Sequence, residues 1–253
     1  MRTIEVRGIR LGEGMPKICV PIVGQTREEI IKEAKSIVGE PADLVEWRVD
    51  WYEDVFDGQK VTVLLGELRE VLGDMPILFT FRSKTEGGEK EIDEMTYSML
   101  NRLAIDSGAI DLVDVEIYQV NEELDAILDC AHKKDVKVIG SSHNFEKTPE
   151  KEQLINTVCY MEKLGVDISK LAVMPQDARD VITLLEAAEE IVRDYAKNPV
   201  ITMSMAGQGA ISRVAGEVFG TAVTFGSVSK ASAPGQINVR DLKKMLEIVH
   251  DAR

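Results

Sequence analysis

Short β-rich runs alternate with longer amphipathic runs along almost the whole chain, and this alternation limits the folds open to it. Eight runs have the length and the β-branched or aromatic content of strands. They are 17–23, 43–50, 76–82, 112–117, 136–143, 170–174, 199–205 and 222–227. Helical patterns lie between the strands, and the clearest are 26–38, 93–107, 121–133, 148–164, 177–193 and 238–249.

Two of these helical patterns carry signals for their first residues. Thr26 with Glu29 has the spacing of a capping box, in which two side chains satisfy free backbone N–H groups. Thr148 before Pro149 predicts an N-cap followed by proline at the first helical position.

Strands alternating with helices over 253 residues favour an α/β fold of the (β/α)8 (TIM) barrel type. An open, doubly wound sheet shows the same alternation and is the alternative. Segments 3–6 and 9–11 flank Gly8 and predict a short N-terminal β-hairpin that would close the bottom of the barrel. No linker rich in proline, glycine or serine divides the sequence. We therefore expect residues 1–253 to form a single barrel domain.

Composition excludes several classes of function. With 30 basic and 44 acidic residues the net charge is −14, which disfavours binding to a nucleic acid backbone. Three separated cysteines and three histidines give neither a disulfide framework nor zinc-ligand spacing, so no metal site is expected. We find no signal peptide and no apolar run of about 18 residues that could span a membrane. A cytoplasmic protein is expected.

Several predicted strands carry charges on one face. In 43–50, for example, Val45, Trp47 and Val49 alternate with acidic or basic residues. The apolar face should pack under the helices, so the charged face should point into the barrel. That set comprises Glu46, Arg48, Asp50, Arg82, Asp114, Glu116, His143 and Lys170. A structural ion-pair network is one explanation. We favour an active site, because most of these charges lie late in their strands, where barrel enzymes hold their sites.

Lys170 and His143 carry the strongest chemical signal in this set. Lys170 faces inward, and Arg48 and Arg82 are its expected neighbours. Low polarity and nearby cations favour a neutral amine, which can attack a ketone and form a Schiff base. His143 is the histidine at the end of a predicted strand and could act as base and acid near neutral pH. A lysine with a histidine in a barrel predicts a Schiff-base lyase or an aldolase.

Motifs along the chain resemble those of the type I 3-dehydroquinate dehydratase family of the shikimate pathway. They are Glu-Trp-Arg-Val-Asp at 46–50, Phe-Thr-Phe-Arg at 79–82, Glu-Gly-Gly at 86–88, Asp-Val-Glu at 114–116, Ser-Ser-His-Asn-Phe at 141–145, Lys-Leu-Ala-Val-Met-Pro at 170–175, Met-Ser-Met at 203–205, Ser-Arg at 212–213 and Ala-Ser-Ala-Pro-Gly-Gln at 231–236. A single motif would be weak evidence. The resemblance is strong because all of them occur in order.

The resemblance implies a reaction and the residues that perform it. Lys170 would form an imine with the C3 ketone of 3-dehydroquinate. His143 would remove a C2 proton and protonate the departing C1 hydroxyl, in a syn elimination of water, while Glu86 orients it. Glu46, Arg48 and Arg82 would bind the ring hydroxyls, and Arg213, Ser232 and Gln236 the carboxylate. Met203 and Met205 would pack against the ring, although core packing explains them equally well.

The resemblance also implies a homodimer that needs no metal or organic cofactor, and a loop at 226–236 that covers the substrate. Three features depart from the family pattern, where many relatives have Ser instead of Pro21 and a larger polar residue instead of Ser142. The third is the glycine-rich segment 206–209, which we expect to make the covering loop more mobile.

Two other functions remain open from the sequence. A class I aldolase would share Lys170, and the glycines after the last two strands suit a phosphate, whereas Arg213 and Gln236 favour a carboxylate. A non-catalytic barrel that binds quinate-like acids would not need Lys170, His143 and Glu86 together.

Overall fold

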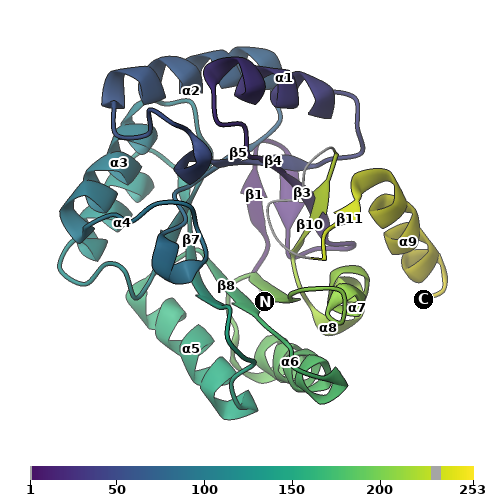
Figure 1. Cartoon of the computed structure of the whole chain (residues 1–253). Helices are drawn as coiled ribbons and strands as arrows, with labels where there is room; N and C mark the ends of the chain where they lie inside the picture. The colour runs from purple at the N-terminus through teal and green to yellow at the C-terminus, as the bar shows by residue number, and fades with distance from the viewer. Residues whose placement is uncertain (1, 229–234) are drawn as a thin grey trace.

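A ring of parallel strands surrounded by helices forms the body of the protein (Figure 1). The computed structural model describes residues 2–228 and 235–253. A hairpin of β1 (Ile4–Val6) and β2 (Ile9–Leu11) comes first. The ring strands are β3 (Lys17–Ile22), β4 (Leu44–Arg48), β5 (Ile77–Thr80), β6 (Leu112–Glu116), β7 (Lys137–Asn144), β8 (Ile168–Val173), β9 (Val200–Ser204) and β10 (Val223–Ser227), and the short β11 (Ile237–Asn238) pairs with β10.

Helices cover the outside of the ring (Figure 1). They are α1 (Arg27–Ile37), α2 (Gly58–Leu72), α3 (Glu94–Asp106), α4 (Leu124–Lys133), α5 (Lys151–Leu164), α6 (Ala178–Glu190), α7 (Ala210–Val214), α8 (Gly216–Phe219) and α9 (Val239–Asp251). Among the described residues, no helix is both long and apolar enough to cross a membrane.

The strand order shows that the sheet closes on itself. Each strand from β3 to β9 pairs in parallel with the next, and β10 pairs with β3. Between β9 and β10, Val200 and Thr221 form a parallel bridge, and the backbone N–H of Ala222 donates to the carbonyl of Val200 at 2.8 Å. The (β/α)8 barrel prediction is thus confirmed, and the open sheet is wrong.

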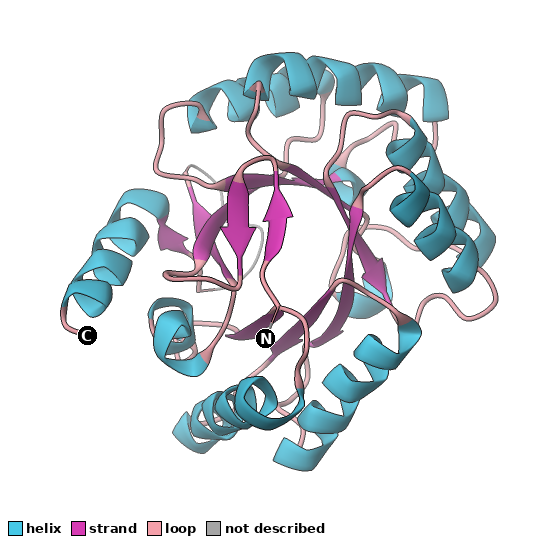
Figure 2. Cartoon of the chain, turned by 180° about the vertical axis from the view of Figure 1, so that it is seen from behind, coloured by secondary structure: helices cyan, strands magenta, loops and turns pink. Residues whose placement is uncertain are grey.

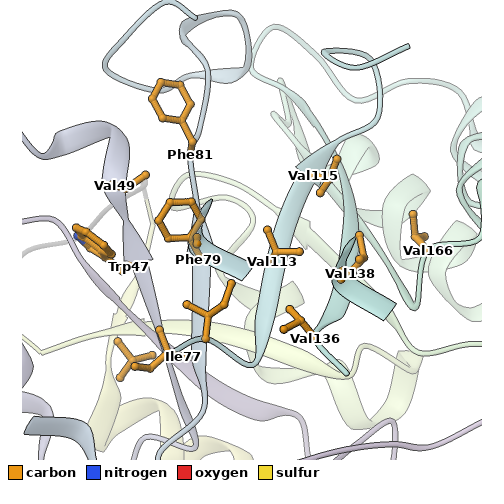
Figure 3. Packing of buried hydrophobic residues seen from close by; sticks show 14 of the residues in the cluster. Trp47, Val49, Ile77, Phe79, Phe81, Val113, Val115, Val136, Val138 and Val166 are labelled. Carbon is orange, nitrogen blue, oxygen red and sulfur yellow. The ribbon is translucent and has the colours of Figure 1, made fainter. Parts of the chain in front are cut away.

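The outward faces of the strands carry the main apolar core. Trp47 on β4, Phe79 on β5 and Val113 on β6 are fully buried side chains that point from the sheet toward the helices (Figure 3). Trp47 and Phe79 meet edge to face, with ring centroids 5.7 Å apart. This packing occupies the apolar side of each strand and turns the alternate residues into the barrel.

The lower part of the lumen is a second apolar cluster. Leu44, Leu78, Leu112, Ile139 and Ile168 come from successive strands and are buried there. Val6 and Leu11 of the hairpin belong to the same cluster, and the hairpin lies over the opening of the ring in the view from behind (Figure 2). The predicted closure of the barrel bottom by the hairpin is confirmed.

Element boundaries differ from the sequence predictions in a few places. The capping box of Thr26 and Glu29 is present. Thr148 is not a helix cap, because α5 begins at Lys151 and the Thr148 hydroxyl instead donates to the carbonyl of Met174 at 3.2 Å. Helix α2 is not among the helical patterns predicted above, although its buried residues have helical spacing. They are Val61, Leu64, Leu65, Leu68 and Leu72.

Candidate active site

Polar side chains form a layer in the lumen directly above the apolar cluster. Two residues beyond the apolar layer come Glu46 on β4, Thr80 on β5, Asp114 on β6, Ser141 on β7 and Lys170 on β8. Because side chains alternate between faces, a step of two residues keeps each of them inside the barrel. All five are buried.

An open cavity lies at this level of the barrel. Its lining combines charged, aromatic and thioether side chains from many elements. The lining residues are Glu46, Arg48, Arg82, Glu86, Gly87, His143, Phe145, Lys170, Ala172, Met203, Met205, Arg213, Phe225 and Gln236. The structure therefore brings together every site residue predicted from the sequence except Ser232, which lies outside the described residues.

The nitrogen of Lys170 contacts carboxylates. Lys170 Nζ donates to Asp114 Oδ2 at 2.9 Å and lies 3.7 Å from Glu46 Oε1. It also lies 4.9 Å from the centre of the Phe225 ring, within range of a cation–π contact. The sequence predicted cations, Arg48 and Arg82, as the neighbours of Lys170. That expectation was incomplete, because anions make the direct contacts.

His143 is held through its ring and its backbone by one carboxyl group. Glu86 Oε2 lies 2.8 Å from His143 Nδ1 and accepts the backbone N–H of His143 at 3.0 Å. Since Oε2 already acts as an acceptor, Nδ1 carries the proton of the neutral ring. His143 Nε2 then has the free lone pair, as a general base requires.

Burial and neighbouring charges set the protonation of this pair. Burial lowers the pKa of His143 well below its usual value, and the cations of Arg82 and Lys170 lower it further. Burial raises the pKa of Glu86 to about 8, with Glu116 and Asp114 adding to the rise against the lowering effect of Arg82. The imidazole of His143 is thus neutral near neutral pH.

The raised pKa of Glu86 predicts a cost in stability. The folded protein holds a proton on Glu86 up to about pH 8, whereas the ordinary value is 4.5. Ionisation therefore opposes folding, and the cost grows as the pH rises from 4.5 to 8. We expect Glu86→Gln, which cannot ionise, to be more stable than the unaltered protein at about pH 9. Its free energy of unfolding, measured by denaturant titration, should be higher by on the order of 2 kcal/mol.

This gain should shrink toward about pH 5, where both proteins are uncharged at this position. Glu91→Gln is the matched control, because the Glu91 side chain is 82% exposed and its replacement should change little at either pH. A Glu86→Gln gain that is equal at both pH values would contradict ionisation as the cause.

Two arginines just above this layer, Arg48 and Arg82, are fixed by buried carboxylates. Asp50 accepts from Arg48 Nε and Nη2, both at 2.8 Å. Arg82 Nη2 donates to Asp114 Oδ1 at 2.7 Å, and Arg82 Nη1 donates to Glu116 Oε1 at 2.8 Å and to Ser141 Oγ at 3.0 Å. The ion-pair network considered as an alternative is therefore present, and it surrounds the cavity.

Arg82 lies two residues beyond the end of β5, and Asp50 lies in a 3-10 turn at Val49–Trp51. The backbone N–H of Arg82 donates to Asp50 Oδ1 at 3.3 Å. This bond links the loops that follow β4 and β5, so that both arginines remain at the cavity after their strands have ended.

The other side of the cavity is lined by α7 and the last strands. Arg213 on α7 is almost fully buried, and its Nη1 donates to the carbonyl of Phe225 at 3.4 Å. Burial lowers the pKa of Arg213 to about 10, which leaves it charged at neutral pH. Met203 and Met205 are buried beside it.

Phe145 and Phe225 line the cavity but were not predicted as site residues. Each lies two residues from another residue of the lumen face, Phe145 after His143 and Phe225 after Val223. The alternation of side chains along a strand, with a period of two, would therefore have placed both residues on the lumen face.

Comparison with known proteins agrees with this geometry. Residues 18–253 match the model of the type I 3-dehydroquinase family. The chain belongs to this family. It is a carbon–oxygen lyase of the 3-dehydroquinate dehydratase class, which belongs to the shikimate pathway. The 3-dehydroquinate dehydratase of Clostridioides difficile is 49% identical over 249 residues, covering 98% of each chain. That of Listeria welshimeri is 52% identical over 252 residues, covering 99% of each.

A solved structure extends the likeness to the fold. Type I 3-dehydroquinate dehydratase from Clostridium difficile, described with covalent modified comenic acid, superposes with a TM-score of 0.97. The two chains are 48% identical, and the match covers 100% of this chain and 99% of the other. The whole dehydratase chain, including the hairpin, therefore has a counterpart in a relative.

Proposed function

We propose that this dehydratase converts 3-dehydroquinate to 3-dehydroshikimate and water through a Schiff base on Lys170. The observation that carries the proposal is one cavity that holds Lys170, a neutral His143 oriented by Glu86, and the cation of Arg213. The Clostridium difficile relative solved with covalent modified comenic acid is consistent with a nucleophile in this family.

The first part of the reaction takes place at Lys170. As a neutral amine it attacks the C3 carbonyl, and the carbinolamine then loses water to give an imine. Once protonated, that imine withdraws electrons from C2 and makes its hydrogen acidic. The carboxylates of Asp114 and Glu46 contact Nζ and hold the lysine nitrogen in place at the cavity.

His143 carries out the proton transfers that follow. Its Nε2 removes the C2 proton, because Nδ1 is held by Glu86 and the depressed pKa keeps the ring neutral. The resulting imidazolium, which Glu86 Oε2 holds through Nδ1, then protonates the C1 hydroxyl, which departs as water from the same face. Hydrolysis of the imine releases 3-dehydroshikimate and restores Lys170.

The remaining residues position the substrate in this proposal. Arg213 and Gln236 bind the carboxylate, with Ser232, because a guanidinium suits a carboxylate geometrically. Glu46, Arg48 and Arg82 face the ring hydroxyls, and Met203 and Met205 pack against the ring. Asp50 occupies one edge of the Arg48 guanidinium, which leaves the other edge for a hydroxyl.

Borohydride trapping tests the Schiff base. We expect the intact mass to rise by one reduced adduct after incubation with 3-dehydroquinate and borohydride, and peptide mapping to locate the adduct on Lys170. Turnover without an adduct would mean that the enzyme eliminates water by another chemistry. Neither turnover nor an adduct would favour the non-catalytic binding barrel, and an adduct only with phosphorylated sugars would favour an aldolase.

We further propose that residues 1–253 act as one barrel domain, and that two such chains form a homodimer in the cytoplasm. A molecular mass in solution of twice the 28.1 kDa of one chain would identify the dimer. Exposed apolar side chains on and near α2 and α3 offer a candidate contact. They are Val63, Met95 and Met99, with Phe56 just before α2.

A further inference from the structure

Asp114 is a fully buried carboxylate that lies behind the cavity wall. It is absent from the cavity lining, unlike Glu46, Arg82 and Lys170. A bound substrate therefore meets Lys170 first and does not replace Asp114. Any effect of Asp114 on the reaction must pass through Lys170 or its neighbours.

The two oxygens of Asp114 have separate partners. Oδ1 accepts from Arg82 Nη2 at 2.7 Å and from Ser141 Oγ at 2.6 Å. Oδ2 accepts from Lys170 Nζ at 2.9 Å. Because two donors hold Oδ1 in place, Oδ2 is fixed toward the lysine nitrogen.

Asp114 also stays ionised in this environment. Burial raises the pKa of Asp114, but Arg82 and Lys170 outweigh burial and hold it well below its usual range. Other titratable or charged groups near Lys170 are Cys19 on β3, Glu46 and Arg48 on β4, Arg82 after β5 and His143 on β7. Of the two carboxylates that contact Nζ, Asp114 is the closer.

We propose that Asp114 is the counter-ion of the protonated imine, a positioning residue that stabilises positive charge on the Lys170 nitrogen after the bond to substrate has formed. This proposal rests on the proposed Schiff-base function. The overall step is balanced: the lysine ammonium and the C3 ketone give a protonated imine and one water, with the same positive charge before and after.

The charge on that nitrogen then changes during catalysis. Removal of the C2 proton turns the protonated imine into a neutral enamine. The Asp114 carboxylate, fixed 2.9 Å from Nζ, therefore favours the charged imine over the neutral carbinolamine before it and the neutral enamine after it. The geometry keeps the protonated imine populated, and this is the species from which His143 removes the C2 proton.

Asp114→Asn tests the proposal, because it removes the charge and keeps the shape and the acceptor toward Arg82. We expect kcat to fall on the order of 10²-fold, with a smaller change in KM. The alkaline limb of the kcat profile should move to lower pH, because the imine loses its proton more easily. Borohydride should still label Lys170, more slowly at high pH.

Ser141→Ala is the matched control. It removes the bonds that Ser141 Oγ makes with Asp114 Oδ1 and Arg82 Nη1 but leaves the charge of Asp114 beside Nζ. The alkaline limb of its kcat profile should therefore stay at the position seen in the unaltered enzyme. If the alkaline limb of the kcat profile also stayed in place in Asp114→Asn, the counter-ion role of Asp114 would be overturned. Borohydride trapping on Lys170 would still support the Schiff base in that case. Absence of an adduct in the unaltered enzyme would overturn both.

A second measurement covers the case in which Asp114→Asn does not fold. Product labelled with ¹³C at C3 reports the protonation of the imine in the unaltered enzyme by NMR. We expect the bound carbon to stay in the protonated form at pH values where the same imine of free lysine is neutral. A neutral imine at those pH values would overturn the proposal.

Discussion

Replacing Lys170 by alanine should abolish turnover, with kcat reduced on the order of 10⁴–10⁶-fold, while the product still binds. Without the amine no imine can form, and the C2 hydrogen keeps the low acidity of an ordinary ketone. The cavity keeps Arg48, Arg213 and Gln236, which make the proposed contacts with hydroxyls and carboxylate. Steady-state kinetics and calorimetric titration with 3-dehydroshikimate would measure the two effects.

The exposed lysine Lys147 provides the control for this experiment. Lys147→Ala should turn over and trap substrate like the unaltered enzyme, since it is outside the cavity. Turnover by Lys170→Ala near the normal rate would remove the Schiff-base mechanism. Because Lys170 pairs with buried Asp114, the thermal unfolding of the variant should be recorded alongside, so that a loss of fold is not mistaken for a loss of chemistry.

Replacing His143 by alanine should separate bond formation from proton transfer. We expect kcat to fall about 10²–10⁴-fold, while borohydride still labels Lys170 with one adduct. The amine and its carboxylate neighbours remain in this variant, whereas the base for C2 and the acid for the C1 hydroxyl are lost. Quenching the reaction with borohydride and measuring the intact mass would reveal an accumulated adduct.

His132→Ala is the matched histidine control. His132 lies on α4, where its ring contacts Asp167 at 3.1 Å, and its side chain is 45% exposed. Its removal should leave both turnover and trapping unchanged. If His143→Ala formed no adduct at all, His143 would be needed before proton transfer and would have a different role.

The period of two in the strands explains why so much of the lumen was predictable. A strand such as β4 shows both faces in its sequence, so the alternation by itself assigns Trp47 to the helices and Glu46 to the barrel. The repeat of strands and helices favoured the barrel, although contacts between β9 and β10, such as the bridge between Val200 and Thr221, are needed to distinguish a closed ring from an open sheet.

Contacts across the barrel were not predictable in the same way. Asp114 meets Lys170 although β7 lies between their strands, and this depends on the closure and stagger of the ring, which no local pattern reports. The same applies to the bond between Arg82 and Asp50 in adjacent loops. The start of α5 was misplaced because Pro149 fits a first helical turn and also the extended segment that the structure contains.

The polar layer above the apolar cluster has a consequence for how this protein acquires activity. The charges in and above it come from β4, β6 and β8 and from the loops after β4 and β5, and each is compensated by a partner on another element. A chain with one of these strands unpaired would leave a charge uncompensated and the cavity incomplete. Enzyme activity during refolding therefore reports the last strand to join the ring, and it should return later than the helical signal.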